Sequence, residues 1–186
     1  GLAEGITPRF LDQPESLIAD FDNIPELYRP GFYLYLGYHA FLNALEHRGK
    51  PFSQIALLDE VNEAFAYSGA GAYVATCDKD QVSVIMTAIP QQYHCAFFEG
   101  YGSGLAYLTG YNAERSIRSV IGDLQIPSEY KACAFKGISL GIVNEEFYNN
   151  DTFLASLVDR AYMVPEQYRG KFLEGLSEAW QQIKEQ

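Results

Sequence analysis

Histidines, cysteines and glutamates are the residues of this chain that could do chemistry. His39 and His47 are eight residues apart, which is not the i, i+4 spacing at which two helical histidines chelate one metal ion. His94 and Cys95 are adjacent, and adjacent residues of a helix point in different directions. The cysteines are Cys77, Cys95 and Cys133. They show no CxxC spacing, so we expect small buried hydrophobic residues in a reducing compartment, with no metal site and no cofactor.

Glu99 and Glu174 hold equivalent positions in two copies of a repeated segment. Paired carboxylates can do acid–base catalysis, but a third copy has Lys136 at this position. The two glutamates are therefore either a solvated helix edge or part of a binding surface. Strings typical of nucleotide-binding and hydrolytic sites, GxxxxGK[ST], GxSxG and HExxH, do not occur in the sequence. We predict no catalytic residues, and a non-enzymatic protein is favoured.

Three segments of the chain align with one another without a gap. They are residues 89–104, 126–141 and 164–179. Counting from a branched aliphatic residue at place zero, each has Pro at place one, Tyr at place four, Gly at place eleven, and Gly or Ala at place fifteen. Residues 58–73 form a weaker copy that keeps Gly69 at place eleven. A fifth copy begins IPELY at Ile24, with Gly37 two residues late.

The spacing within the repeat predicts a helix. Places four, eight, eleven and fifteen lie on one face of an α-helix, and Pro is well tolerated in the first turn. Glycine inside a helix costs about 1 kcal/mol relative to alanine. Close approach of another backbone or of a ligand would offset this cost. The glycines for which we predict close helix packing are Gly69, Gly100, Gly104, Gly137, Gly141 and Gly175.

Second helices are predicted between the helices that begin with proline. Asn112 is a candidate N-cap for a helix over 113–124, and Asn150 or Asp151 for another over 152–163. The equivalent segment 81–88 is also predicted to be helical, although its β-branched residues disfavour a helix. Antiparallel helix pairs of about 34 residues are typical of α-solenoids. The sequence therefore predicts an all-α fold in which four to five degenerate helix-pair repeats stack as a short α-solenoid.

The length of 186 residues suits one domain, and no linker divides the chain. We expect a single domain over residues 1–186, with the repeats in 24–186. Residues 1–23 are expected to form an N-terminal arm with a short helix at 15–21.

This organisation resembles the tetratricopeptide class of helical repeats in architecture, although the Trp, Leu-Gly and Ala signature of that class is missing. The phrases FAYSGAG (65–71) and FFEGYGSG (97–104) are similar to an aromatic-x-x-Gly-x-Gly phrase of the helical domain found beside enediyne polyketide clusters. The second resemblance implies an accessory protein, with no catalytic residues to carry over.

The charge of the chain narrows the choice of partners. The net charge is −11, and no run of Lys or Arg provides the clustered positive charge that phosphate binding needs. Nucleic acid is therefore not an expected partner. No apolar run approaches the roughly 20 residues needed to cross a bilayer, and the first residues lack the features of a signal peptide. We expect no membrane insertion and a cytoplasmic protein.

The aromatic residues are the strongest indication of function. Tyr93, Tyr130 and Tyr168 recur at place four and form either a buried ladder between repeats or part of a groove near Glu99 and Glu174. The leading hypothesis is an adaptor or chaperone that holds a peptide or partner subunit of basic character in an aromatic, acidic groove. One alternative is a small-molecule-binding or accessory biosynthetic protein with an apolar pocket lined by the glycines. The other is a structural subunit of a larger assembly.

Overall fold

The computed structural model describes residues 23–47, 54–146 and 157–184, together with Arg9, Gln13, Glu15, Ile18 and Phe21. Within these residues the regular structure is helical and no strand occurs, which confirms the all-α prediction. Most of the short helix predicted at 15–21 lies outside the described residues. So do Asn150 and Asp151, the candidate caps of the last second helix.

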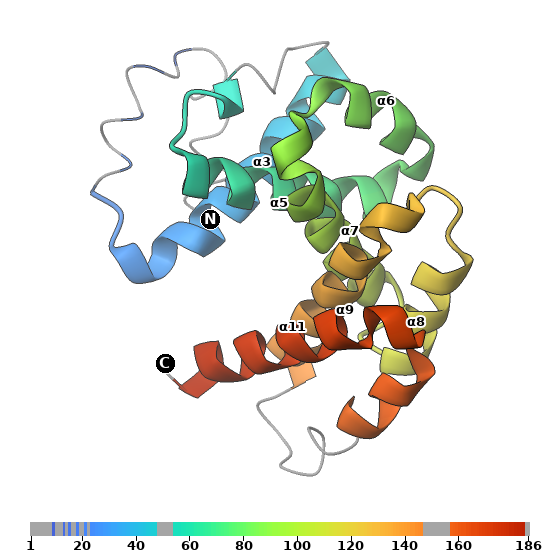
Figure 1. The fold of residues 1–186 in the computed structure, drawn as a ribbon. Coiled ribbons are helices and arrows are strands. Elements are labelled where there is room, and N and C mark those ends of the chain that lie inside the picture. Colours follow the sequence, from blue (N-terminus) through green and yellow to red (C-terminus); the bar gives the residue numbers. More distant parts are fainter. Residues whose placement is uncertain are drawn as a thin grey trace.

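Long helices follow one another through the described structure (Figure 1). They are α3 (Arg29–His47), α5 (Glu60–Cys77), α7 (His94–Leu108), α9 (Lys131–Glu146) and α11 (Glu166–Lys184). Each contacts the next in chain order, α3 with α5, α5 with α7, α7 with α9 and α9 with α11. The apolar side of each helix is thus covered by its neighbours, as in helical repeats. A solenoid shape for this stack stays a prediction.

Two shorter helices lie beside the row of long helices. α6 (Val82–Ala88) and α8 (Ala113–Gly122) are on the same side of the row in Figure 1. The predicted cap of α8 is present, since the Asn112 side chain accepts a hydrogen bond of 3.0 Å from the backbone N–H of Arg115. Val82 and Ile85 of α6 are buried, and this burial offsets the poor helix propensity of β-branched residues.

A single turn of 3₁₀ helix separates the proline from the α-helix in three copies. These turns are η1 (Glu26–Tyr28), η3 (Gln91–Tyr93) and η4 (Ser128–Tyr130). In each, the tyrosine N–H donates to the proline carbonyl at 2.9 to 3.0 Å. The α-helix then begins at place five, so the tyrosine of place four is held at the helix entrance.

The copy that begins at Ile24 is in register with the others without a gap. Gly37 stands at place thirteen, where an added Cβ would lie 1.8 Å from the carbonyl oxygen of Ala66. Gly71 and Gly102 stand at place thirteen of later copies and also lie against the backbone of the following long helix. The interpretation of Gly37 as a displaced place-eleven glycine was therefore wrong. Its neighbour is the next helix, whereas a place-eleven glycine faces the preceding one.

Candidate binding surface

The place-eleven glycines lie where two long helices touch. An added Cβ would lie 1.8 Å from the Leu34 carbonyl oxygen at Gly69, 1.7 Å from that of Ser68 at Gly100, 1.8 Å from that of Glu99 at Gly137 and 2.6 Å from that of Lys136 at Gly175. Each partner stands at place ten of the preceding copy. The contact therefore places the residues of place ten side by side on neighbouring helices, as one row.

The glycines of place fifteen have looser contacts. An added Cβ would lie 2.7 Å from the Ala72 carbonyl oxygen at Gly104, and 2.9 Å from the Ser103 hydroxyl oxygen at Gly141. In both cases the space beside the glycine is filled by the preceding long helix. The glycine stripe is therefore a helix contact along these positions.

The repeated tyrosines stack on aromatic rings at place nine of the preceding copy. Ring centroids are 4.9 Å apart for Tyr93 and Tyr67, 5.1 Å for Tyr130 and Phe98, and 5.5 Å for Tyr168 and Phe135. Tyr93 is 5% exposed, while Tyr130 and Tyr168 are half-buried. The three rings thus lie between successive helices, and the described contacts are those of a ladder.

The hydroxyl groups of this ladder are also bonded. They donate to the Glu63 carboxylate from Tyr93, to Nδ1 of His94 from Tyr130 (2.9 Å), and to the Ser128 carbonyl from Tyr168 (3.3 Å). Nε2 of His94 lies 2.9 Å from the Ile89 carbonyl oxygen, which can only accept. In the neutral ring Nε2 therefore carries the proton, and Nδ1 is free to accept from Tyr130.

Basic residues at place five were missed by the sequence reasoning. Their side-chain nitrogens lie within hydrogen-bonding distance of a preceding carbonyl oxygen, in the pairs Arg29–Ile24 (2.9 Å), His94–Ile89 (2.9 Å), Lys131–Ile121 (3.0 Å) and Arg169–Ala161 (3.2 Å). The signal was present in the alignment, since four of the five copies have a basic residue there. These side chains tie the helix entrance to the segment before it.

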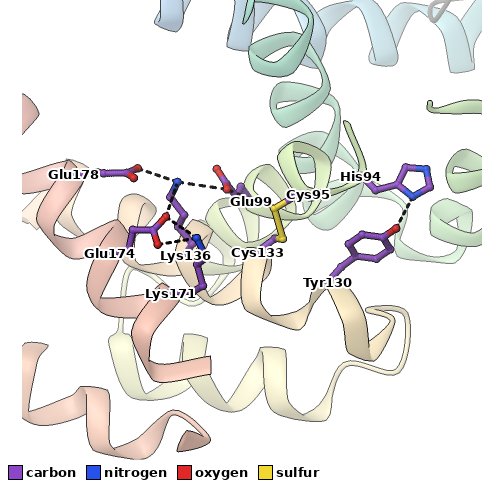
Figure 2. Close-up of a disulfide and its surroundings, with 9 residues drawn as sticks. All are labelled: His94, Cys95, Glu99, Tyr130, Cys133, Lys136, Lys171, Glu174 and Glu178. Carbon is purple, nitrogen blue, oxygen red and sulfur yellow. Dashed lines mark hydrogen bonds and ion pairs between the residues drawn. A yellow bond between two sulfur atoms is a disulfide. The ribbon is translucent and has the colours of Figure 1, made fainter. Parts of the chain in front are cut away.

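Lys136 brings the two predicted glutamates together (Figure 2). Its Nζ lies 3.5 Å from Oε1 of Glu99, 3.5 Å from Oε1 of Glu174 and 3.0 Å from Oε2 of Glu178. Lys171 adds a second ammonium group, 2.7 Å from Glu174. Glu178 was not predicted, although it follows Glu174 by four residues and therefore shares its helix face. We call these five residues the ion-pair cluster.

Burial and neighbouring charges shift the pKa values of the ion-pair cluster in different directions. Burial raises the pKa of Glu99, against the attraction of Lys136. The hydrogen bond from Lys171 lowers the pKa of Glu174. Burial alone would lower the pKa of Lys136, but its hydrogen bond to Glu178 and the nearby carboxylates raise it. Three carboxylates thus face two ammonium groups, which leaves one negative charge in excess.

A disulfide joins Cys95 of α7 to Cys133 of α9 beside the ion-pair cluster (Figure 2). The Cα atoms are 5.4 Å apart, a normal separation for a disulfide. The expectation of small, buried, unpaired cysteines was therefore wrong, because Cys95 and Cys133 are bonded to each other and half-buried, and Cys77 is free but exposed. The alignment contained the signal, since the two cysteines hold places six and seven of adjacent copies. Adjacent copies bring neighbouring places together.

Aromatic side chains lie at the other end of the same helix layer. Tyr38 of α3 is half-buried, packs edge-on against Tyr73 of α5 at 5.1 Å, and has its pKa raised by burial. Tyr107 is 62% exposed and lies two turns after Glu99, near the C-terminal end of α7. We call the surface formed by Tyr38, Tyr107 and the ion-pair cluster the long-helix face.

The described residues contain no group of three His, Cys, Asp or Glu side chains arranged to hold a metal ion. None of the helices in the described part of the chain is both long and apolar enough to span a membrane. No family model, curated protein or solved structure matches the chain. The long-helix face offers partly exposed carboxylates, the exposed Tyr107 and the half-buried Tyr38.

Proposed function

We propose that this protein is a non-enzymatic binding module, of the adaptor or chaperone class, that holds a basic segment of another protein on its long-helix face. The observation that carries the proposal is the ion-pair cluster, in which the helix repeat brings carboxylates of α7 and α11 to one surface. The sequence analysis placed the binding residues at Tyr93, Tyr130 and Tyr168. Because these three tyrosines lie in the ladder between helices, we propose Tyr38 and Tyr107 as the aromatic contacts instead.

The charge of the surface favours a partner segment with Lys or Arg at one end. Glu174 and Glu178 keep 39% and 42% of their side-chain surface exposed, so a cation can reach both. Lys136 is only 15% exposed and offers little positive charge to the solvent. Lys171 is 53% exposed and already pairs with Glu174, so the one carboxylate in excess is what favours a further cation. Complementary charges of this kind mainly increase the association rate and the specificity of a complex. The tyrosines would take apolar side chains of the same segment.

The contacts of the glycines weigh against the alternative of a small-molecule pocket lined by them. At Gly69, Gly100 and Gly137 a methyl group would already collide with the backbone of the preceding helix. A ligand cannot occupy the same space. The glycine stripe therefore gives more support to helix packing than to a cavity.

The disulfide bears on the location of the protein. A cytoplasmic protein was expected, but disulfides form and persist mainly in oxidising compartments. The pairing of Cys95 with Cys133 favours such a compartment for the working protein. Alkylation of free thiols in freshly lysed source cells, followed by mass spectrometry, tests this location.

Peptide selection followed by charge reversal tests the proposed function. Segments selected from a random peptide library should be enriched in Lys or Arg. The double variant Glu174→Lys, Glu178→Lys should weaken binding of a selected peptide at least tenfold, or about 1.4 kcal/mol. Because the reversal also removes two ion pairs of Lys136, the melting temperature of the variant is measured as well, and binding is compared where both proteins are folded.

A matched control separates local from general charge effects. Glu114→Lys with Glu129→Lys makes the same change in net charge on α8 and η4, away from the long-helix face. Selection of neutral or acidic peptides would contradict the proposal. Equal loss of affinity in the two double variants would contradict it as well, since binding would then respond to net charge alone.

One observation favours the third reading, a subunit of an assembly. Leu27, Tyr28 and Tyr35 of the first copy are 67%, 65% and 59% exposed. Tyr28 stands at place four, and later copies stack this tyrosine on a preceding helix. The variant Tyr28→Ser, Tyr35→Ser compared with the wild type by light scattering tests this candidate. A wild-type protein that is already monomeric at high concentration speaks against self-assembly through this end.

A further inference from the structure

The Cys95–Cys133 disulfide lies next to the Glu99–Lys136 ion pair of the long-helix face. Cys95 precedes Glu99 by four residues, one turn of α7, and Cys133 precedes Lys136 by three residues on α9 (Figure 2). The covalent bond therefore links the two helix turns that carry the Glu99–Lys136 ion pair. Opening the disulfide therefore removes the covalent restraint between the two turns that carry these charged side chains.

Other contacts hold α7 against α9 close to the disulfide. His94 is hydrogen-bonded to Tyr130 at 2.9 Å, and the backbone of Glu99 touches Gly137. The buried ring of Phe98 and the half-buried ring of Tyr130 are stacked at 5.1 Å. These contacts need no covalent bond, so the helix pair should stay packed when the disulfide opens.

The sulfur atoms lie beside the Glu99–Lys136 ion pair, and the Glu99 carboxylate is the charged group in contact with Cys95. Cys95 and Cys133 are half-buried, so a small thiol can reach the bond. Oε1 of Glu99 lies 3.7 Å from Sγ of Cys95. A thiolate that attacks Cys95 brings a second negative charge next to this carboxylate. Attack on Cys133 expels the Cys95 thiolate into the same position, so Glu99 opposes both routes.

We propose that the Cys95–Cys133 disulfide is a thiol–disulfide exchange site, opened by a dithiol reductant and protected by the Glu99 carboxylate, that controls the rigidity of the long-helix face. One thiolate of the reductant attacks a protein sulfur, and the electron pair of the S–S bond goes to the other protein sulfur, which takes up a proton. The second thiol of the reductant then attacks the mixed disulfide and releases the remaining protein thiol. Two electrons and two protons pass to the protein, and the reductant becomes a disulfide. This site does not depend on the identity of the proposed partner.

The rate of reduction tests the proposal without a partner. Protein equilibrated with oxidised glutathione is trapped with N-ethylmaleimide, and its intact mass should show modification at Cys77 alone, as the maleimide adduct or the glutathione mixed disulfide. In a time course with dithiothreitol under native conditions, Glu99→Gln should be reduced at least about threefold faster than the wild type, because a charge this close to the sulfur is weakly screened. Glu174→Gln removes a charge from the same cluster but not from the sulfur, and should match the wild type.

Two further measurements accompany the time course. The circular dichroism of the reduced protein should keep its helical signal, while hydrogen exchange should increase in α7 and α9. Glu99→Ala serves in place of Glu99→Gln if the latter does not fold. Three reactive thiols after oxidation would overturn the proposal. So would equal reduction rates for the Glu99 and Glu174 variants, or loss of the helical signal on reduction.

Discussion

Gly100→Ala is the substitution for which the structure makes the sharpest prediction. The added Cβ would lie 1.7 Å from the carbonyl oxygen of Ser68, whereas ordinary van der Waals contact begins at 3.4 Å. Because the obstacle is backbone, no side-chain rotation relieves it, and α5 and α7 must separate. Overpacking of this kind costs about 1–3 kcal/mol. We place Gly100 at the upper end of that range because the helix contact is continuous with the core.

The gain in helix propensity opposes this cost. Alanine is better than glycine inside a helix by about 1 kcal/mol. We therefore expect Gly100→Ala to lower the free energy of unfolding by about 2 kcal/mol net. For a chain of this length, that corresponds to a fall in melting temperature of roughly 4–8 °C.

Gly170→Ala is the matched control. Gly170 lies within α11, and an added Cβ there would meet no atom within 4 Å. Only the gain in helix propensity remains, so this variant should be more stable than the wild type by up to about 1 kcal/mol. Urea unfolding followed by circular dichroism measures both variants. A Gly100→Ala protein as stable as the wild type would refute the close contact between α5 and α7.

Three further predictions concern buried and charged groups. Tyr93→Ala should destabilise the protein by about 3–5 kcal/mol in urea unfolding, and more than Tyr168→Ala, because Tyr93 is 5% exposed while Tyr168 is half-buried. Tyr101→Phe should lower the free energy of unfolding by about 1 kcal/mol, since it removes the 2.9 Å hydrogen bond to Asp123; an unchanged value would show that this bond contributes nothing net. The raised pKa of Glu99 means that its contribution to stability is fully present below the ordinary value of 4.5 and is lost as the pH rises through the raised value. In urea unfolding between pH 4 and pH 7, the free energy of unfolding of the wild type should therefore fall relative to that of Glu99→Gln as the pH rises. If the difference between the two free energies does not change with pH, the burial of this carboxylate is contradicted.

The repeat itself could be predicted from the sequence because its physical causes are local. Proline, tyrosine and glycine recur at fixed places, and the helix period of 3.6 residues turns those places into one face. Asn112 caps α8 as predicted, because capping depends on the first residues of the helix alone. The register of the first copy was misjudged, since Gly37 serves the following helix, and the glycines that recur at place thirteen, Gly71 and Gly102, were not used in the alignment.

The candidate site depended more on tertiary structure. Glu99 and Glu174 were found as equivalent positions, but only the stacking of α7, α9 and α11 shows that Lys136 holds them together. The same stacking pairs Cys95 with Cys133, which the absence of a CxxC spacing had argued against. Interactions between copies join residues about one repeat apart, so local patterns do not reveal them.

The sequence by itself determined the helical class and the places where helices come close, because helix period, proline entry and glycine cost act within one segment. Only the tertiary structure decided what each repeated residue faces. The tyrosines at place four could line a groove or fill the space between helices, and the rings of Tyr67, Phe98 and Phe135 on the preceding copies place them between helices. That choice depends on which neighbour covers a helix face, and it is made only when the helices pack.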